Sequence, residues 1–223
     1  MKKFCVFLCM FMAGCATGFD RSDLNRRLSQ QVKISEKDAE IESLFERRPL
    51  ANLPVKVAIA LNTSHWNEDD KNKILAVGDE LVSQGVATDV VLLPQMVMAD
   101  RNLRTIRLAA ARYQADVVFV ISSINDLDRY YNPLSVLYIT IVGAWVIPGS
   151  HIDSLYIAEG TLFDVRNEYI YFSVHAEGEG STWGPGAIIE ANDAIKRAKT
   201  RCVEKFATSL REQSQKILLD TIR

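Results

Sequence analysis

The three histidines are the side chains of this 223-residue sequence best suited to proton transfer at neutral pH. His65, His151 and His175 are widely spaced, and neither an HExxH nor a GxSxG motif occurs. His151 and Asp153 lie two residues apart, so in a strand both side chains would point the same way and could share a metal or a proton. No third ligand follows at a suitable spacing. We therefore expect neither catalytic residues nor a metal site, and take a loop histidine beside an aspartate as the simpler interpretation.

Nucleotide and calcium binding are also not expected. NTSHWNEDD (residues 62–70), which follows the first apolar run, has no glycine to let backbone amides close on a pyrophosphate, and the sequence contains no phosphate-binding loop. Asn125, Asp126 and Asp128 resemble part of a calcium loop but lack its glycine and terminal glutamate. We interpret these three residues as a turn and predict no cofactor.

The residue with the clearest chemical role is Cys15. Lys2 and Lys3 precede an apolar run at 4–12 that is too short to cross a bilayer, as in an export signal. The following Met-Ala-Gly-Cys (residues 12–15) resembles the bacterial lipoprotein processing motif, which implies that the Cys15 sulfur is diacylated and becomes residue one of the mature chain. An uncleaved signal anchor, or an ordinary signal cut after Ala13 or Ala16, are the alternatives.

Lipidation of Cys15 would determine both where the protein is located and which cysteine remains as a free thiol. Two or three acyl chains hold a protein far more firmly on a membrane than one chain does. By analogy with lipoprotein sorting in diderm bacteria, Ala16 rather than Asp after the cysteine predicts the outer membrane, facing the periplasm. Cys5 and Cys9 would leave with the signal, so that only Cys202 remains and no intramolecular disulfide can form. Cys202 falls on an apolar helical stripe, which predicts a small buried side chain.

Charge and length limit the remaining possibilities. Removing Lys2 and Lys3 from the 26 basic residues leaves 24 against 28 acidic residues, a balance of −4 that argues against nucleic acid as a partner. We assign residues 1–14 to the signal peptide, 15–53 to the acylated cysteine and a polar tether with a short helix near Ser35, and 54–223 to one α/β domain.

The first half of that domain shows alternating strand and helix patterns. Apolar runs at 55–62, 87–94 and 116–123 predict strands, and amphipathic stretches that end near Gly85 and Tyr113 predict the helices between them. The acidic triplet at 68–70 suits the first turn of a helix, where the dipole favours negative charge. The order βαβαβ predicts a partly parallel sheet with covering helices.

The second half predicts antiparallel strands and a final helix. Leu134 to Pro148 is almost continuously apolar, and we expect one long strand or two short strands that meet near Gly143. Residues 154–180 divide into two strands around Arg166-Asn167, and GEGSTWGPG (178–186) predicts a turn or, alternatively, a ligand-contacting loop with Trp183. Beyond Pro185, three- and four-residue apolar spacing predicts a long amphipathic helix.

The apolar block supplies the candidate contact residues. Leu134 to Pro148 is either a core strand or an exposed apolar edge for a second subunit, a partner protein or the membrane. In the second case Tyr138, Trp145 and the Trp183 loop would make the contact. Altogether we predict an α/β domain of two or three layers, with a mixed sheet and a long C-terminal helix.

The segment YITIVGAWVIPGSHIDSLYIAEGTLFDVRNEYIYF (138–172) resembles the signature block of the rhombotarget lipoprotein family. The cysteine at the end of the signal and LPVKVAIA (53–60) fit this family too. Its members carry a C-terminal glycine-rich and hydrophobic sorting tail, whereas this chain ends in QKILLDTIR, so that processing step is not carried over. More distantly, the order of elements is similar to the curli-secretion lipoprotein, the TolB amino-terminal domain and the LpoB activator of peptidoglycan synthases.

These resemblances imply assembly and partner binding rather than catalysis. The expectation is a non-catalytic outer-membrane lipoprotein whose periplasmic domain binds an envelope partner or associates with itself. A periplasmic hydrolase or small-ligand-binding lipoprotein, with a pocket near His151, Asp153 and His175, is the alternative.

Overall fold

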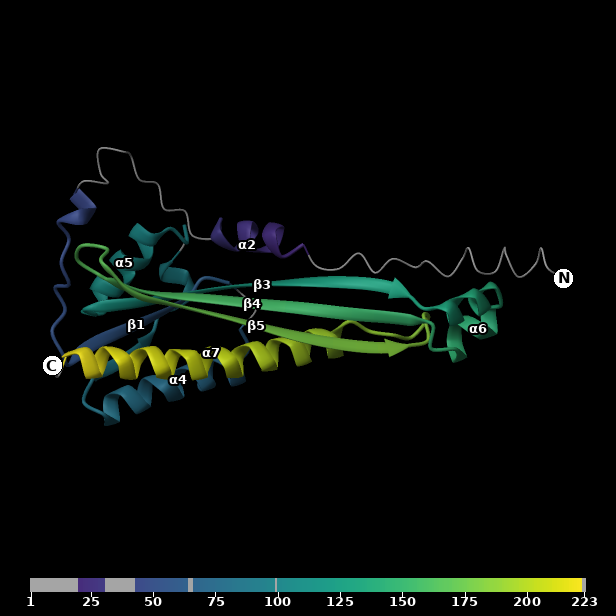
Figure 1. The fold of residues 1–223 in the computed structure, drawn as a ribbon. Helices are drawn as coiled ribbons and strands as arrows, with labels where there is room; N and C mark the ends of the chain where they lie inside the picture. Colours follow the sequence, from purple (N-terminus) through teal and green to yellow (C-terminus); the bar gives the residue numbers. More distant parts are fainter. Residues whose placement is uncertain (1–19, 31–42, 64–65, 99, 222–223) are drawn as a thin grey trace. The chain divides into compact units, whose positions relative to one another are not determined.

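A computed structural model describes residues 20–30, 43–63, 66–98 and 100–221 of the chain (Figure 1). In chain order the elements are α2 (Arg21–Ser29), β1 (Val55–Leu61), α4 (Glu68–Ser83), β2 (Ala87–Leu92), the 3₁₀ helix η1 (Gln95–Val97), α5 (Leu103–Arg112), β3 (Val117–Tyr131), the 3₁₀ helix η2 (Pro133–Ile139), α6 (Ile141–Val146), β4 (Ser150–Asp164), β5 (Ile170–Gly184) and α7 (Asn192–Thr221). Cys15, the predicted signal peptide and the predicted helix near Ser35 lie outside the described residues.

The sheet has five strands in the order β2-β1-β3-β4-β5. β1 pairs in parallel with both β2 and β3, so that Val57 lies opposite Val90 on one side and Val117 on the other. β4 and β5 are consecutive neighbours joined by residues 165–169. The predicted α/β class, the mixed sheet, the break around Arg166-Asn167 and the long C-terminal helix are confirmed.

The chain divides into two compact units, whose limits fall within α2, β3, β4, β5 and α7. Among the described residues, the first unit holds 20–21, 125–156 and 177–202. The second unit holds 22–124, 157–176 and 203–221.

Helix α4 begins where its acidic first turn predicts. The Asn67 side chain accepts a hydrogen bond from the Asp70 backbone at 2.8 Å, and the Asp70 carboxylate accepts one from the Asn67 backbone at 3.0 Å. This reciprocal capping box explains the burial of Asp70 without a metal. Beyond the helix, Gly85 adopts a φ of 72°, a left-handed conformation that costs glycine little.

The second unit is built in three layers around its part of the sheet. Ala58, Ala60 and Val118 face α5, where Ile106 and Ala110 complete a buried cluster. Side chains of the opposite parity face α4 and α7, and the rings of Phe119 and Phe206 lie 6.1 Å apart. In Figure 1 α4 and α7 run along the same side of the strands.

In the first unit α7 lies directly on β5, which corrects the turn predicted at 178–186. A Cβ built on Gly178 would lie 2.0 Å from the Ala198 carbonyl oxygen, and one on Gly180 would lie 2.1 Å from that of Ala194. These glycines are therefore strand residues, and their missing side chains let the helix backbone approach. Cys202 is fully buried on this stripe, as predicted.

One other sequence-based interpretation is wrong. Asn125, Asp126 and Asp128 lie within β3, which continues to Tyr131 rather than ending in a turn near Ser123. The segment assigned to a tether contains α2, whose buried Leu24 and Leu28 are four residues apart. That i, i+4 spacing is a weak helical signal in a polar background.

Candidate functional site

The apolar block forms two short helices, so the strand predicted for Leu134 to Pro148 is wrong. Asn132 caps η2 by accepting a hydrogen bond from the Leu134 backbone at 2.9 Å, and the Thr140 hydroxyl caps α6 through the Gly143 backbone at 3.0 Å. A Cβ built on Gly143 would lie 2.0 Å from the Leu137 carbonyl oxygen. Local capping and this close approach thus outweigh the β-propensity of the many branched residues.

Most apolar side chains of this segment are exposed, so it is not a core strand. We use the name apolar tip for residues 131–147 together with 183–189. Ile139 is 88% exposed, Val142 71%, Trp183 66% and Trp145 58%. The other strongly exposed apolar residues of the tip are Tyr131, Leu134, Val136, Leu137, Val146 and Ile188. Contiguous exposed apolar surface of this kind usually marks an interaction site.

Tyr138 holds the two parts of the tip together. Its hydroxyl donates a hydrogen bond to the Ile147 carbonyl at 3.0 Å and accepts bonds from the backbone of Gly149 at 2.7 Å and Gly186 at 2.9 Å. The Ala187 backbone also donates to the Ala144 carbonyl at 3.0 Å. Of the three predicted contact residues, Trp145 and Trp183 are exposed on the tip, whereas the described contacts of Tyr138 are structural.

His151 lies on the edge of this region in an aromatic row that crosses three strands. Its ring stacks on Tyr130 with a centroid distance of 5.2 Å and faces Trp183 at 6.4 Å, and its Nε2 lies 3.1 Å from the Asn132 amide nitrogen. Asp153 accepts a hydrogen bond from the Tyr130 hydroxyl at 3.1 Å. Burial, followed by the Asp153 charge, raises the pKa of Tyr130 above its ordinary value.

Among the described residues, no further metal-binding side chain joins the predicted group of His151, Asp153 and His175. His151 and Asp153 belong to the first unit, and the exposed His175 belongs to the second. Within the described ranges, no cluster of three or more histidine, cysteine or carboxylate side chains could hold a metal ion.

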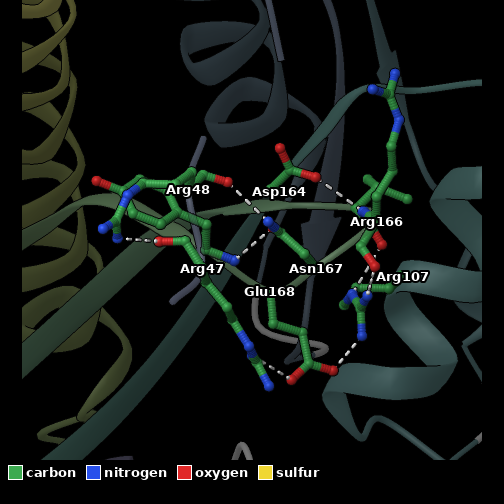
Figure 2. Close-up of polar contacts among 9 residues, drawn as sticks. Arg47, Arg48, Arg107, Asp164, Arg166, Asn167 and Glu168 are labelled. Atoms are coloured by element: carbon green, nitrogen blue, oxygen red, sulfur yellow. Dashed lines mark hydrogen bonds and ion pairs between the residues drawn. The ribbon is translucent and has the colours of Figure 1, made fainter. Parts of the chain in front are cut away.

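A polar network at the β4–β5 turn was not anticipated from the sequence (Figure 2). The buried Asp164 carboxylate accepts hydrogen bonds from the backbones of Leu50 at 3.1 Å, Ala51 at 3.2 Å and Arg166 at 2.9 Å, and from the Tyr171 hydroxyl at 2.9 Å. These bonds fasten the segment before β1 to the end of the sheet. Leu50 and Ala51 precede Asp164 by 114 and 113 residues, so no local sequence motif predicts these contacts.

Three arginines complete the network (Figure 2). Arg107 donates to the Val165 carbonyl at 2.9 Å and pairs with Glu168, which also pairs with Arg47 at 3.2 Å. Arg166 pairs with Asp116 at 2.8 Å. Because each of these guanidinium groups faces a carboxylate, the network fixes the turn and offers little net charge to an anionic ligand.

Tyr171 gives this network a measurable signature in alkaline solution. Burial, reinforced by hydrogen bonding to Asp164, raises its pKa to about 12. Because an unfolded tyrosine ionises near pH 10, the folded protein keeps a proton between about pH 10 and 12 that the unfolded chain loses. Stability from this group is complete below pH 10 and falls as the pH rises through that window. Carbon-13 NMR of ring-labelled tyrosine should show a midpoint near 12 that Tyr171→Phe abolishes; a midpoint near 10 would contradict the buried hydroxyl.

The second unit also contains an apolar cavity of about 480 Å³. Its wall combines one face of β1 and β3 with parts of α4 and α7 and the segment before β1, including Val57, Phe119, Ile74, Leu210 and Tyr171. None of the described residues that line it is a histidine, an aspartate or a glutamate. Its volume falls in the range of small-molecule sites, and its lining suits an apolar ligand rather than a hydrolytic reaction.

No family model and no curated protein matches the chain. Among solved structures, a PelC dodecamer from Paraburkholderia phytofirmans is 15% identical and covers 71% of this chain and 87% of its own, with a TM-score of 0.32. The lipoprotein GNA1162 from Neisseria meningitidis is 14% identical, with 58% and 85% covered and a TM-score of 0.32. The hypothetical protein CT253 from Chlamydia trachomatis is 12% identical, with 74% and 94% covered and a TM-score of 0.29.

These matches therefore include a lipoprotein, but similarity at this level assigns neither partner nor activity to this chain. The resemblance to the rhombotarget family stays a prediction. Among the helices of the described residues, none combines the length and the apolar character needed to cross a bilayer.

Proposed function

We propose that this protein is a non-catalytic lipoprotein of the cell envelope, anchored in the outer membrane through Cys15, whose α/β domain contacts another envelope component through the apolar tip. The observation that carries the proposal is the tip itself. It exposes two tryptophans and several branched side chains on a folded, hydrogen-bonded scaffold. Such a surface is unfavourable in water unless something covers it.

The position of the candidate acid–base groups supports a non-catalytic role. His151 is stacked between two aromatic rings, and its hydrogen-bond partner Asn132 is itself a helix cap. This surrounding explains the histidine as part of the sheet surface. A general base would instead need a nucleophile or substrate proton within hydrogen-bond reach.

Mass spectrometry of the chain expressed in a diderm bacterium tests the anchor. Trypsin should release residues 15–21, because cleavage after Arg21 leaves the mature amino terminus in a short peptide. We expect this peptide to carry acyl chains and the protein to sediment with outer membranes. Cys15→Ser should abolish both results, whereas Cys202→Ser alters a buried residue and should leave acylation intact. An unmodified Cys15 thiol in the wild-type chain would refute the anchor.

The apolar cavity favours a second candidate function, the binding of a small apolar ligand. Val57 lines the cavity from β1, an interior strand of the sheet, so Val57→Phe should place its ring in the ligand volume. With N-phenyl-1-naphthylamine as fluorescent probe, we expect affinity to fall at least about tenfold, which corresponds to roughly 1.4 kcal/mol. Val82→Phe is the matched control, because Val82 is exposed on α4 and does not line the cavity. Equal probe binding by both variants would exclude this site.

A further inference from the structure

We propose that the apolar tip inserts into the same lipid leaflet that holds the acyl chains on Cys15. This inference rests on the proposed lipid anchor and specifies what the tip contacts: the hydrocarbon and headgroup boundary of a bilayer. It gives the protein two attachments to one membrane, a covalent lipid and a folded apolar wedge.

The tip contains no charged side chain to oppose insertion. From residue 130 to 150, and again from 180 to 189, the sequence has no aspartate, glutamate, lysine or arginine. Moving an ionised group into a low-dielectric medium is strongly unfavourable, so this composition removes the largest barrier to lipid contact. Protein-binding surfaces, by contrast, commonly surround their apolar centre with a polar rim.

Several main-chain polar groups of the tip also have hydrogen-bond partners within the protein, as an environment without water requires. Caps from Asn132 and Thr140 satisfy amides at the starts of η2 and α6, and the Tyr138 hydroxyl accepts two further amides. The Asn132 amide group donates to the Pro148 carbonyl at 2.9 Å. Backbone groups in lipid must find partners within the protein, and these side chains supply them.

The aromatic residues of the tip match the boundary between lipid and water. Tyr131, Trp145 and Trp183 are all more than half exposed. Tryptophan and tyrosine concentrate at both interfaces of a membrane, because an apolar ring and a polar group occupy the two sides of the boundary. Ile139 and Val142, the most exposed apolar residues of the tip, would enter the acyl region.

The predicted anchor is attached close enough to reach this surface. Arg21 forms ion pairs with Glu177 and with Glu179, the latter at 2.7 Å, on the exposed face of β5. These carboxylates raise the pKa of Arg21, most strongly through the Glu177 hydrogen bond. Arg21, the sixth residue after Cys15, is thus held on β5.

The distances along the chain then place lipid and tip within reach of each other. Arg21 is the sixth residue after Cys15, and an extended chain of six residues spans at most about 22 Å. Trp183 follows Glu179 by four strand residues, a rise of roughly 13 Å on the same strand face. The acylated cysteine can therefore lie at the level of the tip. A protein partner bound to the tip would have to share this space with lipid.

Tryptophan quenching in vesicles tests insertion directly. The full acylated chain is incorporated into vesicles of phosphatidylethanolamine and phosphatidylglycerol at about 3:1, with or without bromine on the lipid acyl chains. We expect a blue-shifted emission and at least about twofold quenching by brominated lipid, because Trp145 and Trp183 would lie in the boundary. The double variant W145F/W183F keeps only the buried Trp66 and should show neither effect.

A charged residue in the tip provides the matched test. Val142→Asp should abolish the quenching of Trp145 while leaving acylation of the 15–21 peptide unchanged. Met96→Asp introduces the same charge at an 87% exposed site outside the tip and should leave quenching intact. Acylated protein whose Trp145 and Trp183 are unquenched overturns the insertion, including the case in which the tip is covered by a second copy. Loss of acylation itself counts instead against the anchor, so the two failures are distinguishable.

Discussion

Replacing Gly178 by alanine should cost about 3 kcal/mol or more of folding stability, toward the upper end of what overpacking a core costs. A Cβ there would lie 2.0 Å from the Ala198 carbonyl oxygen and 2.4 Å from the Cys202 amide nitrogen, both in the backbone of α7. Backbone atoms cannot rotate away as a side chain can, so helix and strand must separate. For a chain of this size the melting temperature should fall by roughly 6–12 °C, measured by circular dichroism.

Gly184, on the same strand, is the matched control for this substitution. The nearest atoms to a Cβ at Gly184 belong to Ile189, at 3.8 Å, which is an ordinary van der Waals contact. Gly184→Ala should therefore change stability by no more than about 0.5 kcal/mol. Equal melting temperatures for Gly178→Ala and Gly184→Ala would show that α7 does not lie on β5 at this close distance.

The sequence predicted those elements whose signal is local and periodic. The largely apolar run of β1 predicted a strand, the amphipathic stretch of α4 with its acidic first turn predicted a helix, and both occur where expected. The Gly85 stop and the break around Arg166-Asn167 were likewise predicted from residues with particular turn conformations. In these regions, propensity, pattern and capping all favour the same structure.

The apolar tip shows why the strand predicted for Leu134 to Pro148 is wrong. Branched and aromatic residues favour a strand in the core, yet what decides the conformation here is the spacing of Asn132, Thr140 and Gly143. Such capping residues are also common outside helices. They predict a helix here only if the segment is already known to lie outside the core. The helical conformation also explains why Trp145 is exposed, since a core strand would have buried alternate residues.

A similar limit applies to the glycines of β5 and to Asp164. Gly178 and Gly180 resemble turn residues in sequence because the helix that approaches them begins more than ten residues later. Asp164 precedes a turn, which by itself suggests local capping, but two of its four described donors are the backbone amides of Leu50 and Ala51, 114 and 113 residues away. Such long-range contacts determine the energetics at these positions, and a single sequence does not specify them.

Asp164→Ala should therefore destabilise the second unit strongly. The substitution removes an acceptor fully buried in the structure and leaves the amides of Leu50 and Ala51, as well as the Tyr171 hydroxyl, without their bonds to it. An unsatisfied buried donor costs about 1–3 kcal/mol, and contacts within one network are not additive, so we expect a total loss of roughly 3–5 kcal/mol. Urea denaturation followed by circular dichroism would measure this loss.

Two further variants separate the network from a general effect of charge. Glu159→Ala removes a carboxylate from an exposed position of the same strand β4 and should change stability by less than about 0.5 kcal/mol. Asp164→Asn keeps one oxygen acceptor but presents an amide group to donors, so its loss should fall between those of the two alanine variants. If Asp164→Ala were no less stable than Glu159→Ala, the carboxylate would not hold the segment before β1.

The alkaline midpoint of Tyr171 should move down toward 10 in Asp164→Ala. The loosened segment would admit water to the phenol, whose pKa is raised by burial.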